Sequence, residues 1–250
     1  MTSLNLVTFA SSNWTESPKR YKEQLSVINS KFHLFDKTFV WNENNLGNSY
    51  KERFSRYFSD HGFAYWSWKP ITILKAMEQI KDGDLLFYID GGCTFPMNDI
   101  EKFVSEFKAF CEEFYSSDKF VGLTYFLERP WKQFPGFPNI TVVKQEILKL
   151  FGLEKDEEFL FRYPHWQATM MLLKKNDETI DFLKEWYLFF LENYELAIRS
   201  GFTDKTGQHR MFIHNGGDQA IMQCMLYSKK AKIADMNFIQ NYKIIEHIRK

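Results

Sequence analysis

Short apolar runs alternate with segments of helical periodicity along the chain, and this alternation limits the possible folds more than any other feature. Runs with the length of strands lie at residues 4–10, 37–41, 84–89, 119–126, 167–175 and 232–236. Segments with apolar residues at three- and four-residue spacing lie at 17–32, 50–62, 70–83, 100–114, 177–197 and 218–230. Such alternation predicts an α/β fold with an open, mostly parallel sheet flanked by helices.

The domain organisation follows from what interrupts this pattern. The 250-residue chain contains no internal repeat, low-complexity tract or Ser/Pro-rich linker, so we expect a single domain over residues 1–250. Two long polar or aromatic loops, 126–139 and 199–217, could be lids, an acceptor cleft or plain surface.

Charge and cysteine content exclude several classes of protein. Lys plus Arg equals Asp plus Glu at 32 each, so no global field favours nucleic acid. The three cysteines are isolated and form no C-x-x-C pair, which fits a reducing compartment. No apolar run approaches the roughly 20 residues of a membrane span, and the N-terminus does not resemble a signal peptide. We therefore expect a cytoplasmic protein without a transmembrane segment.

A carboxylate follows the most apolar predicted strand. Asp90, Gly91 and Gly92 come directly after the run at 84–89. In open α/β sheets ligands bind beyond the carboxyl ends of the strands, and a carboxylate there could hold a divalent cation. The alternative interpretation is that Asp-Gly-Gly is only a turn.

Aromatic and basic residues gather before the helix predicted to begin at Pro70. Trp66, Trp68 and Lys69 lie where a helix N-terminus would favour an anion such as phosphate. The alternative is that the tryptophans fill the core and Lys69 is solvated. For either tryptophan alone, packing is the better interpretation.

The stretch "GFAYWSWKPITILKAMEQIKDGDLLFYIDGGC" (62–93) resembles the W-x-W-K-P and Y-x-D segment of small bacterial glycosyltransferases with a GT-A fold, a family linked to capsule and lipopolysaccharide assembly. "YPHWQATMMLLKKNDETIDFLKEW" (163–186) and "HNGGDQAIMQCML" (214–226) are similar to later segments of the same family. The resemblance covers about residues 4 to 236.

The resemblance implies a donor-binding half at about 1–125 and an acceptor half at about 126–250. Its implied donor contacts are Thr8, Ser11, Trp66, Trp68, Lys69, Asp90, Gly91 and Gly92. Its implied acceptor contacts are His165, Trp166, Gln167 and Gln219. Mn²⁺ or Mg²⁺ is the implied cofactor, with Asp90 and His214 as candidate ligands, although Gly92 replaces the second carboxylate of the usual Asp-x-Asp motif.

The catalytic candidates are Asp90 and Asp218. Asp218 is the first choice as general base for an acceptor hydroxyl, but its place before "QAIMQCM" favours the interpretation that it caps a helix. His165, His209 and His214 are alternatives, and none has metal-ligand spacing.

The activity expected from the resemblance is hexosyl transfer from a nucleotide sugar, with UDP-sugar preferred, to a glycan or lipid-linked acceptor in surface polysaccharide synthesis. The protein would then lie in the cytoplasm, with peripheral contact at the inner membrane as an option. Two alternatives stay open: another nucleotide-dependent transferase (nucleotidyl or phosphoryl), and a non-catalytic carbohydrate-binding module. P-loop, dinucleotide-binding and serine-hydrolase signatures are absent from the sequence.

Overall fold

The computed structural model describes residues 2–60, 62–125, 138–198 and 206–242. Most of the predicted loop at 126–139, and residues 199–205 of the loop at 199–217, lie outside the described residues. No helix within the described ranges is long and apolar enough to cross a membrane.

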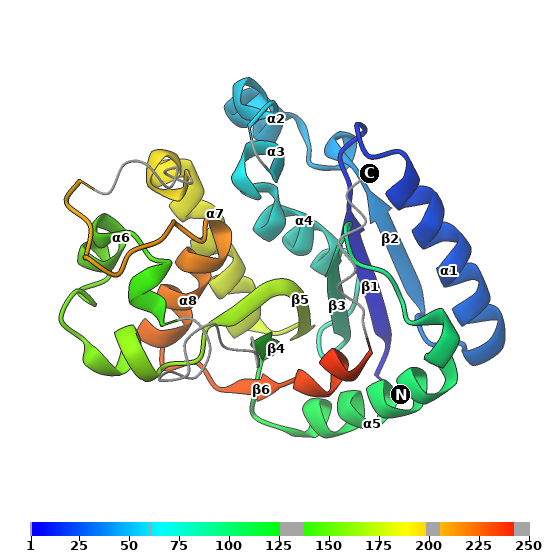
Figure 1. The fold of residues 1–250 in the computed structure, drawn as a ribbon. Helices are drawn as coiled ribbons and strands as arrows, with labels where there is room; N and C mark the ends of the chain where they lie inside the picture. The colour runs from blue at the N-terminus through cyan, green and yellow to red at the C-terminus, as the bar shows by residue number, and fades with distance from the viewer. Residues whose placement is uncertain (1, 61, 126–137, 199–205, 243–250) are drawn as a thin grey trace.

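A six-stranded sheet runs through the molecule in the order β2-β1-β3-β5-β4-β6 (Figure 1). Its strands are β1 (Leu4–Phe9), β2 (Lys37–Trp41), β3 (Leu85–Asp90), β4 (Val121–Tyr125), β5 (Trp166–Lys174) and β6 (Ile233–Asp235). All neighbouring pairs are parallel except the two that β5 makes, so five strands share one direction. The prediction of an open, mostly parallel sheet is confirmed.

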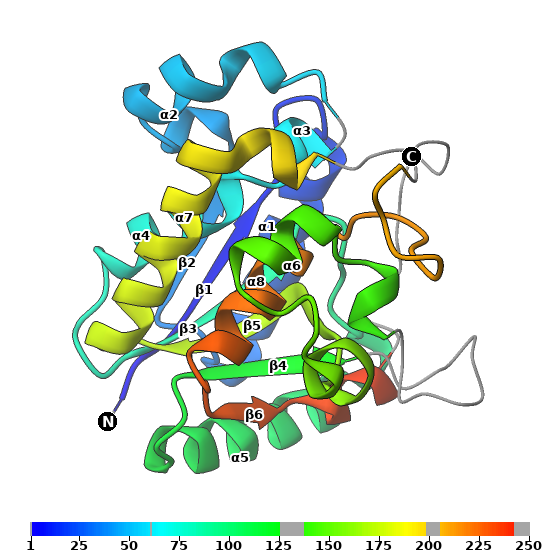
Figure 2. The ribbon, with the colours of Figure 1, turned by 90° about the vertical axis from the view of Figure 1, so that its left-hand side faces the viewer.

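Helices cover both faces of the sheet (Figure 2). The helices of the described residues are α1 (Glu16–Phe32), α2 (Asn48–Phe54), α3 (Gly62–Tyr65), α4 (Trp68–Met77), α5 (Ile100–Ser116), α6 (Gln145–Leu150), α7 (Asp177–Ala197) and α8 (Asp218–Ser228). One hydrophobic cluster joins α1 and α5 to the sheet, and a second joins α4, α7 and α8 to its other face. The flanking helices that the sequence predicts are therefore present.

Alternation along the central strands explains the two clusters. Phe87 and Met170 pack on the α1 and α5 side, whereas their neighbours Tyr88 and Met171 pack on the α4 and α7 side. Successive side chains of a strand point to opposite faces, and both faces are covered here. This double burial is why these strands read as continuous apolar runs rather than as alternating ones.

The order of the sheet reverses between β1 and β3. From β1 the chain reaches β2 on one side through α1, and later returns to β3 on the other side of β1. Phe9 and Asp90, the last residues of β1 and β3, lie opposite each other in the register. In an open α/β sheet this reversal leaves a crevice at the carboxyl ends of the two strands, and Asp90 lies there.

The predicted helix at 50–62 is the main difference from the sequence-based expectation. It ends at Phe54, and Gly62 begins a left-handed turn instead of stopping the helix. Every residue from Gly62 to Trp66 has a φ between 48° and 68°. A left-handed turn costs an L-residue roughly 1–2 kcal/mol, so periodicity alone could not predict it. A Cβ on Gly62 would lie 2.5 Å from the Trp66 ring, which explains glycine at the start of the turn.

Two further differences are smaller. Helix α4 begins at Trp68, two residues before the predicted Pro70. The short helix α6 and a π-helical segment at Glu158–Arg162 were not predicted, because elements of five or six residues carry little periodic signal.

The glycines after β3 give a matched test of this packing. A Cβ at Gly91 would lie 2.5 Å from the Phe9 carbonyl oxygen, whereas a Cβ at Gly92 would meet only the Trp14 ring, at 3.8 Å. We expect Gly91→Ala to lower the free energy of unfolding by about 1–3 kcal/mol, and Gly92→Ala to change it by less than about 0.5 kcal/mol. Urea unfolding measures both, and equal losses would contradict the close approach of β1 and β3.

Candidate active site

A cavity of about 720 Å³ opens at the crevice between the ends of β1 and β3. This volume is typical of sites for small molecules. Its wall includes the loop after β1, the loop after β3, residues 58–60, the left-handed turn with the start of α4, and the segment leading into α8. Val142, His165 and Thr169 also line it.

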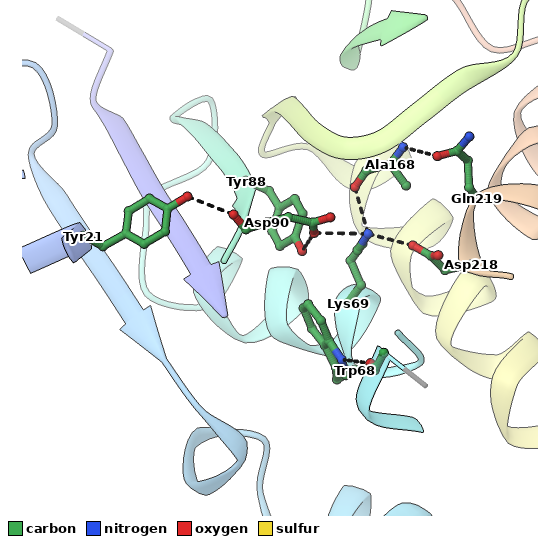
Figure 3. Close-up of polar contacts among 9 residues, drawn as sticks. Tyr21, Trp68, Lys69, Tyr88, Asp90, Ala168, Asp218 and Gln219 are labelled. Atoms are coloured by element: carbon green, nitrogen blue, oxygen red, sulfur yellow. Dashed lines mark hydrogen bonds and ion pairs between the residues drawn. The ribbon is translucent and has the colours of Figure 1, made fainter. Parts of the chain in front are cut away.

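The ammonium group of Lys69 lies in the cavity wall between two carboxylates (Figure 3). Its Nζ is 2.7 Å from Asp218 Oδ2 and 3.3 Å from Asp90 Oδ1. It also donates a hydrogen bond of 2.9 Å to the Ala168 carbonyl oxygen of β5. Three acceptors match the three N–H groups of an ammonium. Lys69 therefore joins α4, β3, β5 and α8 at one point, which we call the Lys69 cluster (Lys69, Asp90, Asp218 and Ala168 O).

Burial and charge set the protonation of this cluster. Lys69 is only 2% exposed, and burial by itself lowers its pKa. The carboxylates of Asp218 and Asp90 outweigh burial and raise the pKa of Lys69 above its ordinary value, so the side chain stays charged. Burial raises the pKa of Asp218 to about 6, against the opposing charge of Lys69. At neutral pH one ammonium faces two carboxylates, so the three groups together carry a formal charge of −1.

The carboxylate of Asp90 is fixed from behind and faces the cavity. The buried Tyr88 hydroxyl donates to its Oδ1, and the Tyr21 hydroxyl donates to its backbone oxygen at 2.8 Å. About a quarter of the Asp90 side chain is exposed. The Cys93 N–H donates a hydrogen bond of 2.9 Å to the Asp90 carbonyl oxygen, so the Asp-Gly-Gly stretch does form a turn. The turn and the candidate site are therefore the same feature.

The favoured interpretation of Asp218 as a helix cap is wrong. Gly217 occupies the N-cap position with a φ of 63°, and Asp218 is the first residue of α8. Asp218 is 5% exposed, and its carboxylate forms an ion pair with Lys69. A buried ammonium is a stronger partner for it than the backbone N–H groups of the first turn.

Aromatic side chains form one part of the cavity wall. They are Phe9, Trp14, Phe58, Phe63, Trp66 and Trp68. Trp68 is both a core residue and a wall residue, since it stacks on Phe9 with ring centroids 4.0 Å apart and donates to the Gly62 carbonyl at 3.0 Å. Trp14 is 44% exposed at the cavity rim. The sequence-based prediction missed Trp14, although it follows soon after a predicted strand, where sites in such sheets lie.

His165 belongs to a buried hydrogen-bond network. Its Nδ1 lies 2.8 Å from Asn139 Oδ1, and its Nε2 lies 2.5 Å from Gln219 Nε2. Gln219 also accepts the Ala168 N–H at 3.3 Å, which connects this network to the Lys69 cluster (Figure 3). Burial lowers the pKa of His165 to about 3, so the ring is neutral at physiological pH. It can orient Gln219, but a neutral ring with this pKa is a poor base.

The structure brings most of the predicted site residues to one wall. Those lining the cavity are Ser11, Trp66, Trp68, Lys69, Asp90, Gly91, Gly92, His165, His214, Asp218 and Gln219. Three others are buried in strands away from the described cavity lining: Thr8 in β1, and Trp166 and Gln167 in β5. Trp166 packs edge-on against Tyr125, and Gln167 lies 3.4 Å from the Thr124 hydroxyl. Ligand contacts by these three have no support in this geometry. The alternative interpretation, in which Lys69 is solvated, is wrong, because Lys69 is only 2% exposed.

The described residues do not fit a resident divalent cation. Across the described parts of the chain, no group of three or more His, Cys, Asp or Glu side chains is arranged to hold a metal. The predicted ligands Asp90 and His214 both line the cavity, but Asp90 Oδ1 already contacts Lys69 and the Tyr88 hydroxyl.

Comparison with known proteins gives structural likenesses only. No protein-family model matches the chain, and no curated protein sequence matches it. A glycosyltransferase involved in glycosylation of the major capsid of PBCV-1 is 9% identical with a TM-score of 0.47, over 99% of this chain and 93% of that one. Mouse xyloside xylosyltransferase 1 is 9% identical with a TM-score of 0.45, over 93% of this chain and 84% of that one.

A third solved structure is a galactosyltransferase in complex with donor and acceptor sugar analogues. It is 12% identical with a TM-score of 0.39, over 92% of this chain and 72% of that one. Likenesses at this level do not establish an activity for this chain, so the residues of the site must carry any functional proposal.

Removal of the Lys69 ammonium should destabilise the folded protein. Lys69→Met leaves Asp90 and Asp218 without their shared cation, so we expect the free energy of unfolding to fall by on the order of 3–5 kcal/mol at pH 7.5. The loss should be smaller at pH 5, because an acid whose pKa is raised in the folded state destabilises that state less once protonated.

The control is Lys31→Met, which breaks an exposed pair with Glu101 and should leave the unfolding midpoint unchanged at both pH values. Urea unfolding of both variants decides the matter. A Lys69→Met protein as stable as the Lys31→Met protein would show that the buried ion pairs contribute nothing.

Proposed function

We propose that this protein is a glycosyltransferase that moves a sugar from a nucleotide-sugar donor, UDP-sugar first, to a glycan or lipid-linked acceptor in bacterial surface polysaccharide synthesis. One observation carries the proposal. Asp90 and Asp218, from distant parts of the chain, converge on one buried ammonium in the wall of a cavity at the reversal point of the sheet. Two carboxylates at a ligand cavity can supply a general base and can stabilise positive charge on a glycosyl group, as in glycoside hydrolysis.

The donor fits the crevice for reasons of shape. Gly91 and Gly92 present backbone without side chains to the cavity, which lets a ligand approach the end of β3 closely. Ser11 on the loop after β1 offers a hydroxyl, and the rings of Trp14 and Trp66 offer flat faces for a sugar or a base. The sequence resemblance to small GT-A glycosyltransferases adds support to this placement.

Asp218 is the residue we assign to proton transfer. With a pKa of about 6 it is ionised at pH 7 yet basic enough to accept a proton. It would take the proton of the acceptor hydroxyl as that oxygen bonds to the anomeric carbon. The bond between that carbon and the phosphate oxygen breaks, and the nucleoside diphosphate leaves with the bonding electrons.

The Lys69 cluster would stabilise the positive charge that develops on the sugar during transfer. The anomeric carbon becomes oxocarbenium-like while the donor bond breaks, as in glycoside hydrolysis. A fixed net charge of −1 beside it favours this positive charge in the transition state. Asp90, held by Lys69 and Tyr88, is the exposed member of the cluster and the one we place nearest the donor.

We also propose a cytoplasmic location with peripheral contact at the inner membrane. The support is chemical: Cys93, Cys111 and Cys224 are all free and buried, as suits a reducing compartment.

A ligand screen tests the proposal against its alternatives. UDP and UDP-sugars should raise the unfolding temperature, because a ligand that binds only the folded state stabilises it. Incubation should then release free sugar and nucleoside diphosphate without pyrophosphate. Pyrophosphate would indicate a nucleotidyl transferase, and stabilisation by free glycans but not by any nucleotide would indicate a carbohydrate-binding module.

The pH dependence of turnover tests the role of Asp218. We expect kcat/KM to fall below an apparent pKa of about 6, since the protonated carboxyl cannot accept a proton. Asp218→Asn should lower kcat by roughly 10²–10⁴-fold and remove this acid limb. Asp181→Asn, the same change at an exposed carboxylate outside the cavity wall, serves as the control and should keep the limb. An acid limb retained in Asp218→Asn would assign the base to another group.

A further inference from the structure

The Lys69 cluster has the ligand set of a metal site, with an ammonium at its centre. Two carboxylate oxygens and one backbone carbonyl oxygen surround Nζ at 2.7, 3.3 and 2.9 Å. Hard oxygen donors of these kinds are the ones that Mg²⁺ and related cations take in proteins. The point toward which these oxygens converge is therefore a cation site, and a side chain of the chain itself fills it.

Lys69 is held in this position from several sides. Its Nζ lies 5.5 Å from the ring centroid of Tyr88 and 6.0 Å from that of Trp68, so aromatic faces add to the attraction of the carboxylates. The residue is 2% exposed and starts from the first turn of α4, which packs against α7 and β1. Movement of the ammonium out of the site would leave Asp218 buried without its partner.

A divalent ion cannot share this site. An ion at the centre of the cluster would take the three oxygens that Lys69 already contacts, and its charge would lie against the ammonium. The position that could supply a separate carboxylate carries none. Gly92 has no positive φ, and a Cβ there would meet only Trp14 at 3.8 Å, so the backbone accepts a side chain that the sequence does not provide.

We propose that the Lys69 ammonium is the resident cation of this site in place of Mn²⁺ or Mg²⁺, so that Asp90 binds no divalent metal in the wild-type protein. The occupancy of the site by Lys69 does not depend on the proposed function or on any activity. It predicts a gain of metal binding when the ammonium is removed.

Mn²⁺ titration followed by electron paramagnetic resonance tests the occupancy directly. The wild-type protein should show no Mn²⁺ bound through Asp90. Lys69→Ala should bind one Mn²⁺ at least about tenfold more tightly than wild type, because a repelling charge is replaced by water. Its unfolding temperature should rise with Mn²⁺, and adding Asp90→Asn to Lys69→Ala should remove both effects.

Lys31→Ala is the matched control and should bind no Mn²⁺, since its lysine pairs only at the surface. A wild-type protein that binds one Mn²⁺ lost on Asp90→Asn overturns the proposal, as does a folded Lys69→Ala protein that binds none. If Lys69→Ala does not fold, the wild-type and Asp90→Asn titrations alone decide. Absence of transfer with every donor contradicts the proposed function but leaves the Mn²⁺ result to judge the site.

Discussion

The ion pairs of a single buried lysine hold this site together. Lys69 begins on α4, and its ammonium meets a strand end in Asp90, a helix start in Asp218 and the backbone of β5. A buried charged side chain is stable only where its partners offset the free energy of its lost hydration. Lys69 is 2% exposed, and three oxygens offset that loss here. Because each partner belongs to a different element, the ammonium requires the two sides of the crevice to close on the same point.

The surrounding structure explains why those oxygens lie where they do. The reversal of strand order between β1 and β3 opens the crevice, and Gly91 lets the chain after β3 lie close to Phe9 at the end of β1. Gly217 turns the chain into α8 with a positive φ, which leaves Asp218 to face Lys69 instead of capping the helix. The network through Gln219 and His165 holds β5 from the other side. Burial in this enclosure raises the pKa of Asp218 to about 6.

Much of the fold could be predicted because its strands and helices carry strong periodic signals. Helix α7 matches its predicted range of 177–197, and the end of β3 at Asp90 differs from the prediction by one residue. The left-handed turn at residues 62–66 could not be predicted, since positive φ at four residues other than glycine depends on tertiary packing.

The candidate site was predictable in its members but not in its connections. Position in the α/β pattern indicated Asp90, the N-terminus of the helix predicted at Pro70 indicated Lys69, and the resemblance led to Asp218 as a catalytic candidate. Nothing in the sequence shows that the lysine bridges the two carboxylates, because the contact joins segments far apart along the chain. Thr8, Trp166 and Gln167 lie near the site in sequence, but their side chains are buried in β1 and β5 and do not belong to the described cavity lining, so their ligand contacts stay predictions.

The most direct measurement is a crystal structure of the protein with an unreactive analogue of a nucleotide sugar. The account predicts the sugar ring over the Lys69 cluster, with the anomeric carbon placed so that an attacking hydroxyl at roughly 3–3.5 Å lies within hydrogen-bond reach of Asp218. An analogue bound elsewhere, or one whose sugar points away from Asp90 and Asp218, would contradict it.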